Sequence, residues 1–156
     1  MGDEIRDDSV AGYLQTDHRR LDGLIEACRA TAVAGDIGAA AGLFAEFRAG
    51  LLRHIKIEEE MVFPEFEAAT DLDPRSGPTG VMRFEHLEIT RLLDLIRDLF
   101  AGIEPSVTEF DRLRDRLMSL LREHNGKEER ILYPMTDRMV PADRLRRLVE
   151  RMRSTP

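Results

Sequence analysis

The sequence predicts an all-α protein, an up-down-up-down four-helix bundle followed by a short C-terminal fifth helix. Apolar residues recur every three or four positions through four long segments, which is the spacing of one face of an α-helix. Turn-forming residues separate these segments, and no stretch alternates apolar and polar residues as a half-buried strand would. We expect the 156 residues to form one domain, with the bundle at about 10–138 and the fifth helix at about 141–153.

The first two helices are predicted on either side of a turn at residues 34–36, Ala-Gly-Asp. The polar residues Asp7, Asp8 and Ser9 can cap the first helix. The second helix begins near residue 37 and contains Pro64, which should kink it because proline removes one backbone hydrogen bond; the helix can continue to about residue 69. The residues of this half expected to face inward are Val10, Leu14, His18, Leu21, Leu24, Ile25, Cys28, Leu43, Phe44, Phe47, Leu51, His54, Glu58, Met61 and Val62.

The second half follows the longest connection, Thr70–Gly80, which is rich in Asp, Pro and Gly. A third helix is predicted over about 81–100 and a fourth from near Ser106, and Pro134 and Pro141 then lead into the fifth. The residues of this half expected to face inward are Met82, His86, Ile89, Leu93, Ile96, Leu113, Leu117, Leu120, His124, Glu128 and Ile131.

The two halves carry the same polar residues at matching places. The stretch from His54 to Pro64 has a histidine, a glutamate four residues later, an aromatic residue at the ninth position after the histidine and a proline at the tenth, and the stretch from His124 repeats each of these. Asp17-His18 in the first helix likewise matches Glu85-His86 in the third. Such a duplicated helix pair predicts a pseudo-twofold bundle that brings one set of polar groups from each half to a shared centre.

The inward polar residues have the chemistry of a metal site. Residues four apart share one helix face, so His54 with Glu58, and His124 with Glu128, can each serve one site. One inward histidine is more often a core residue with a hydrogen-bond partner than a ligand, but two buried glutamates without a partner would each cost several kcal/mol. The predicted metal ligands are His18, His54, Glu58, His86, His124 and Glu128. Six ligands exceed what one zinc takes, so two metals bridged by carboxylates suit them better, and nitrogen and oxygen ligands without a thiolate favour iron over manganese or zinc.

Other polar and aromatic residues near the motifs rank behind these six. Glu59, Glu60 and Glu129 turn away from the histidine faces, so we expect them in solvent or, at most, in contact with the ligands from outside. Asp22 lies four residues after His18 and could imitate the other His-Glu pairs. The aromatic residues Phe63 and Tyr133 fall half a turn away from the motif histidines and are predicted to pack outside the site unless the prolines reorient them.

These residues resemble the hemerythrin-like domain, also called the HHE cation-binding domain, from about Val10 to Pro134. The resemblance rests on the Asp-His-x-x-Leu of the first helix, His-x-x-x-Glu in the second and fourth helices and an inward histidine in the third. It implies a four-helix bundle that holds two non-haem iron ions with an oxo or hydroxo bridge, and the six residues above as their ligands.

One departure from the family pattern bears on function. Oxygen-carrying hemerythrins have two histidines four residues apart on the third helix, whereas Met82 and Thr90 stand at those distances from His86. An open metal position is therefore expected near Met82 and Thr90, which argues against reversible oxygen carriage. The resemblance then favours catalase-like peroxide decomposition or redox protection, with binding or sensing of dioxygen or nitric oxide, or iron-linked regulation, as the alternative.

Composition limits the kinds of molecule that the protein is expected to bind. A net charge of −7 argues against nucleic acid, and no apolar run is long enough to span a membrane, so we expect a soluble protein, a monomer or weak homodimer. The resemblance to the hemerythrin-like domain implies small oxygen species (O2, H2O2 or NO) as its partners. The single cysteine, Cys28, cannot form an internal disulfide, which indicates a reducing, cytoplasmic location. Five arginines between residues 144 and 153 alternate with apolar residues as in an amphipathic helix packed on the bundle, with the arginines in water.

Overall fold

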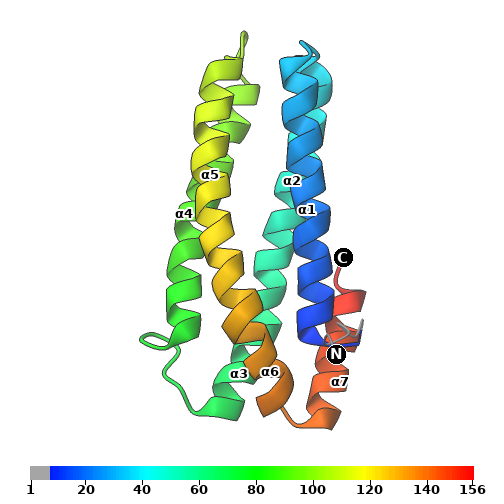
Figure 1. The fold of residues 1–156 in the computed structure, drawn as a ribbon, viewed down its shortest axis with the longest axis vertical. Helices are drawn as coiled ribbons and strands as arrows, with labels where there is room; N and C mark the ends of the chain where they lie inside the picture. The colour runs from blue at the N-terminus through cyan, green and yellow to red at the C-terminus, as the bar shows by residue number, and fades with distance from the viewer. Residues whose placement is uncertain (1–7) are drawn as a thin grey trace.

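The computed structural model describes residues 8–156 and confirms the all-helical class, with no strand in that range. The four long helices are α1 (Val10–Val33), α2 (Ile37–Ile57), α4 (Pro78–Phe100) and α5 (Val107–Lys127). The shorter elements are the π-helical turns η1 (Glu58–Val62) and η2 (Glu128–Leu132) and the helices α3 (Phe63–Thr70), α6 (Tyr133–Met139) and α7 (Ala142–Ser154). The long helices run side by side, and α3, α6 and α7 gather at the end drawn lowest in Figure 1.

The ends of the long helices follow from local side-chain chemistry. Ser9, Asp36 and Ser106 cap α1, α2 and α5, each accepting a hydrogen bond from the backbone N–H three residues on, at 2.9, 3.0 and 3.1 Å. Of the other predicted caps, Asp7 lies outside the described residues. Helix α4 begins three residues earlier than expected because Pro78 occupies its first turn, where a missing N–H costs nothing.

Two hydrophobic clusters fill the bundle, and the four histidines lie between them. On α1, for example, Leu14 belongs to the lower cluster and Leu21 to the upper, with His18 between them; on α4 the same order is Met82, His86 and Ile89. The polar centre is therefore a layer closed above and below by apolar side chains. These layers exclude water and lower the local dielectric around whatever the layer holds.

The π-helical turns correct the predicted inward face of two helices. Phe63 and Tyr133 donate their backbone N–H to the carbonyl five residues back, at Glu58 and Glu128, so each turn contains one residue more than an α-helix would. Past the extra residue the inward face shifts: Ile131, predicted inside, is 53% exposed, whereas Leu132 is 3% exposed. Leu120, also predicted inside, is only partly buried, and its neighbour Leu121 takes the core position. The helix continues past Pro64 to Thr70, as expected.

Helix α7 covers the lower cluster and ties the C-terminus to the bundle. Leu148, Val149 and Met152 are 0–2% exposed, which confirms the predicted amphipathic packing of this segment. The guanidinium of Arg53 donates hydrogen bonds to the carbonyl oxygens of Met152 and Thr155, at 3.3 and 2.7 Å. No helix within residues 8–156 combines the length and the apolar character needed to cross a bilayer.

Candidate metal centre

Each of the four long helices contributes one buried histidine to the centre of the bundle. His18 and His54 approach with their Nε2 atoms 3.1 Å apart, and His86 and His124 do so at 3.2 Å. All four are only 2–4% exposed. The pairs come from α1 with α2 and from α4 with α5, which is the arrangement that the duplicated sequence predicts.

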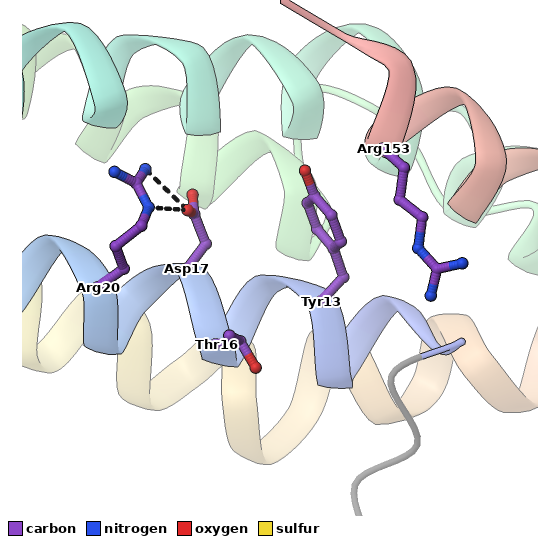
Figure 2. A pocket seen from close by; sticks show the side chains of 5 residues that line it. All are labelled: Tyr13, Thr16, Asp17, Arg20 and Arg153. Atoms are coloured by element: carbon purple, nitrogen blue, oxygen red, sulfur yellow. Dashed lines mark hydrogen bonds and ion pairs between the residues drawn. The ribbon is translucent and has the colours of Figure 1, made fainter.

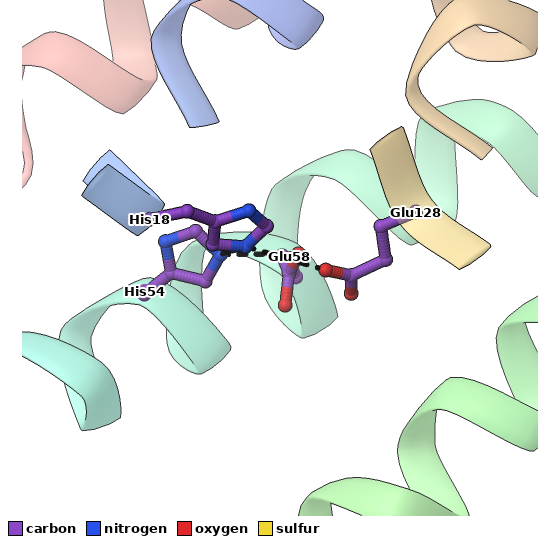
Figure 3. Close-up of side chains that lie close together, drawn as sticks. All are labelled: His18, His54, Glu58 and Glu128. Carbon is purple, nitrogen blue, oxygen red and sulfur yellow. Dashed lines mark hydrogen bonds and ion pairs between the residues drawn. The ribbon is translucent and has the colours of Figure 1, made fainter. Parts of the chain in front are cut away.

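Glu58 and Glu128, both fully buried, lie between the two histidine pairs. The Oε1 of Glu58 is 3.3 Å from the Nε2 of His54, and its Oε2 is 3.2 Å from the Nε2 of His86. Glu128 spans the pairs in the same way, at 3.4 Å from His18 and 2.9 Å from His124. The ligand atoms thus form two groups, each with its own two histidines, and both groups share the two carboxylates. Figure 3 shows the group that contains His18 and His54.

The outer nitrogen of every histidine meets a second carboxylate. The Nδ1 atoms of His18, His54, His86 and His124 lie 2.7–2.8 Å from Glu129, Asp17, Glu59 and Glu85, respectively. A carboxylate at this distance accepts a hydrogen bond from Nδ1–H, and in a neutral ring the Nε2 lone pair is then directed into the centre. Carboxylates in this position are the usual means of orienting a metal-binding imidazole and of raising its basicity.

The centre contains polar atoms that the described part of the protein leaves unsatisfied. Oε2 of Glu58 and Oε1 of Glu128 are buried without a hydrogen-bond partner. Each lies beside an imidazole Nε2, at 3.2 Å from that of His86 and 2.9 Å from that of His124. Buried carboxylate oxygens without a donor are costly, and a bound cation would satisfy them together with the converging nitrogen atoms. The residues present therefore fit a metal centre.

The pKa values of the groups in the metal-free centre also fit a metal site. Burial, the largest influence, lowers the pKa of His54, but the charge of Glu58 and the hydrogen bond to Asp17 outweigh it and raise the pKa to about 10. Burial likewise opposes protonation of His124, while Glu128 and Glu85 raise its pKa to about 9. Burial alone would raise the pKa of Glu58, but His54 and His86 hold it well below its usual range. Without metal, protons thus supply positive charge to both halves of the centre, and a metal would displace them.

The sequence profile of the Hemerythrin HHE cation binding domain matches residues 10–136. The chain belongs to this family. No curated protein matches the chain, and no solved structure matches it. As an HHE domain the protein is a cation-binding module, and its two buried His/Glu groups could hold metal.

Tyr133 of this HHE domain lies inside the centre, and the prediction that it packs outside is wrong. Its hydroxyl donates to Oε1 of Glu58 at 2.5 Å or to Oε2 of Glu128 at 2.8 Å, and it is 3.3 Å from the Nε2 of both His18 and His54. Five residues are close to one turn of π-helix, so η2 places Tyr133 on the same face as Glu128. Burial and the two carboxylate charges raise the pKa of Tyr133 well above 10, which keeps the hydroxyl protonated in the metal-free protein.

Phe63 occupies the corresponding position in the first half of the HHE domain. It gives the His86–His124 group an apolar neighbour where the His18–His54 group has the hydroxyl of Tyr133. Its ring stacks on His86 with the centroids 5.8 Å apart and the planes 9° apart. Met82, one of the two positions four residues from His86, is 3% exposed and belongs to the same lower cluster as Phe63. Thr90 is half-buried, and Ile89 takes the inward position beside it. The two candidate metal-binding groups therefore have different surroundings, one beside a phenol and one beside apolar side chains.

The remaining candidates lie around the centre. Glu59 and Glu129 contact histidines from outside, which was the lesser of the two places expected for them, while Glu60 is exposed and Asp22 belongs to neither ligand group. Asp17, which the sequence marked only as part of the repeat, binds His54 and also lines a surface pocket of about 320 Å³ with Tyr13, Thr16, Arg20 and Arg153. Figure 2 shows its ion pair with Arg20. In the sequence, only the repeat of an acidic residue directly before His18 and His86 singled out Asp17 and Glu85. These are the carboxylates that contact the Nδ1 atoms of His54 and His124.

Proposed function

We propose that this protein holds two iron ions, one in each group of ligands. His18 and His54 would hold one ion, His86 and His124 would hold the other, and Glu58 and Glu128 would serve both. The observation that carries this proposal is the sharing of both carboxylates by both groups, because a single ion would not need six protein ligands in two overlapping sets. Nitrogen and oxygen donors without a thiolate suit iron better than zinc, and manganese remains the second choice.

The reaction that we propose is the decomposition of hydrogen peroxide, or a related protective reaction with a small oxygen species. Iron would supply the redox chemistry. The chain supplies the surroundings: the outer carboxylates orient the four imidazoles, and the apolar clusters above and below exclude bulk water. Tyr133 places a buried hydroxyl donor beside the first group, where it can hydrogen-bond to a bound oxygen species.

The second candidate is reversible binding or sensing of dioxygen or nitric oxide without turnover. The enclosure of the centre favours it, because the six proposed ligands are at most 4% exposed and a bound gas would be protected from solvent. The two candidates predict different outcomes with the same iron-loaded protein.

Mixing iron-loaded protein with hydrogen peroxide and measuring oxygen release separates them. We expect sustained oxygen release with loss of peroxide over many turnovers. If peroxide is not consumed while the diferrous protein forms a reversible dioxygen adduct in the visible spectrum, the enzymatic proposal fails and the binding proposal stands. His54→Ala serves as the control, because it removes a ligand of the first group and should abolish either behaviour.

A further inference from the structure

A groove of about 420 Å³ runs between α1 and α5 and reaches the polar centre. His18, one of the proposed metal ligands, forms part of its wall, as does Glu129, which bonds to the Nδ1 of His18. Asn125 and Gly126, both half-buried, line the α5 side. The wall also has two cationic residues, Arg19 and Arg122, and two acidic ones, Asp22 and Glu129, so its charges balance. A groove of this kind suits a small polar molecule without a large net charge.

The pseudo-twofold repeat supplies an internal comparison for this groove. The corresponding seam lies between α4 and α2, with His86 in the place of His18 and Glu59 in the place of Glu129. There Ile55 replaces Asn125, and Lys56 replaces Gly126. Ile55 is 9% exposed and packs into the upper hydrophobic cluster. A buried apolar side chain therefore fills the position that the half-buried, polar Asn125 has in the groove.

The groove differs from the pocket in Figure 2 in what it reaches. That pocket ends at Asp17 and includes none of the six proposed metal ligands, so a solute in it contacts the centre only through the Asp17–His54 hydrogen bond. The groove between α1 and α5 includes His18 itself. There Glu129 bonds to the Nδ1 of His18, whose Nε2 lies 3.3 Å from the hydroxyl of Tyr133.

We propose that the groove between α1 and α5 is the route by which small polar molecules of the size of hydrogen peroxide reach the centre, and that Asn125 sets its width. The role of this route in catalysis rests on the proposed function, whereas access to His18 does not. Access is one-sided: molecules arrive at the His18–His54 group beside Tyr133, and the Ile55 seam closes the opposite side.

Chemical labelling of the metal-free protein tests the route without any metal. Diethyl pyrocarbonate modifies accessible imidazoles, and mass spectrometry assigns the label to each histidine. The Nδ1 atoms of His18 and His86 each contact a glutamate at 2.8 Å, and Asn125→Ile leaves both contacts in place, so a change in the ratio of their rates reports access. We expect His18 to react at least several-fold faster than His86. Asn125→Ile, which places the residue of the closed seam in the groove, should bring the ratio close to one. Equal rates in the wild type, or a ratio unchanged by Asn125→Ile, would overturn the proposal.

Two further variants test whether a change in folding, and not in access, alters the ratio of labelling rates. Asn125→Ala keeps α5 helical and widens the groove, so His18 should react as fast as in the wild type or faster. Glu123→Ile makes a similar change on the exposed face of the same helix and should leave the ratio unchanged. If Asn125→Ala lowers the ratio, or Glu123→Ile lowers it as much as Asn125→Ile does, the proposal is wrong.

The rate of azide binding to iron-loaded protein, followed by its absorbance, connects the route to the proposed function. Asn125→Ile should slow azide binding at least several-fold with an unchanged iron content, and Glu123→Ile should not. Unchanged azide kinetics in Asn125→Ile would refute the route to the metal. If the wild type takes up no iron while the labelling result holds, the proposed function fails and the route to His18 stands.

Discussion

Tyr133 and Phe63 occupy equivalent positions of the repeat but play different parts. The hydroxyl of Tyr133 can donate to Oε1 of Glu58 or to Oε2 of Glu128, the oxygens that face the His18–His54 group. The oxygens without a donor face the other group, where Phe63 has no hydroxyl to offer. A hydroxyl thus lies beside one ligand group and has no counterpart beside the other.

Tyr133→Phe should destabilise the metal-free protein by about 1–3 kcal/mol, because buried carboxylate oxygens lose their donor. The loss should be smaller in metal-loaded protein, where a cation takes over those oxygens. Urea unfolding of both forms measures this. Tyr13→Phe removes a hydroxyl outside the centre, from a hydrogen bond with Arg53, so its cost should be the same with and without metal. An equal cost for Tyr133→Phe in the two forms would contradict the account.

Asp17→Ala should weaken metal binding about 10- to 100-fold, because His54 loses the carboxylate that fixes its ring. Asp22→Ala is the matched control, since Asp22 is an exposed carboxylate on the same helix and belongs to neither ligand group. Competition with a chelator of known affinity gives both values. Equal weakening by the two substitutions would show that general negative charge, and not the contact with His54, supports the metal.

Cys28 should be nearly inert towards iodoacetamide at pH 8 in the folded protein. Its side chain is fully buried, its thiol lies against the carbonyl of Ala40, and burial raises its pKa to about 11 from 9.0. The thiolate is then about 100-fold scarcer than in an exposed cysteine, on top of the steric block. Mass spectrometry should find the alkylated protein only after unfolding in urea. Rapid alkylation of the native protein would place Cys28 outside the core.

At the scale of elements, the π-helical turns are what the sequence did not reveal. The spacing of apolar residues predicted the long helices closely, because each has a continuous inward stripe. It placed Ile131 inside and Tyr133 outside because it continued the α-helical period through Glu128–Leu132. Proline ten residues after each motif histidine marked a local irregularity but not its form. Nothing in the residue types distinguishes an extra residue within a helix from a simple kink.

Helix α7 should contribute strongly to stability although it lies outside the four long helices. Leu148→Ala removes a side chain that is 1% exposed in the lower cluster and should cost about 2–5 kcal/mol. Leu145→Ala, one turn earlier and only partly buried, should cost clearly less. Thermal or urea unfolding provides the comparison. Equal and small losses would mean that α7 is not part of the cooperative fold.

At the scale of the whole molecule, the duplication explains both what could be predicted and what could not. Matching residues in the two halves predicted that six side chains converge, and the structure brings all six together. The two halves also differ in ways that the repeat did not indicate. Tyr133 stands where the first half has Phe63, and Asn125 stands where it has Ile55, but the effect of each exchange depends on contacts that form only in the packed bundle. The shared layer formed by Glu58 and Glu128 requires all four long helices at once.

Metal stoichiometry is the most direct test of the central claim that these six residues hold two ions. Metal-free protein is titrated anaerobically with ferrous iron, and the iron bound per chain is measured after removal of the excess. We predict two ions per chain in the wild type. Binding of one ion or fewer at saturation would contradict a centre in which both carboxylates serve two metals.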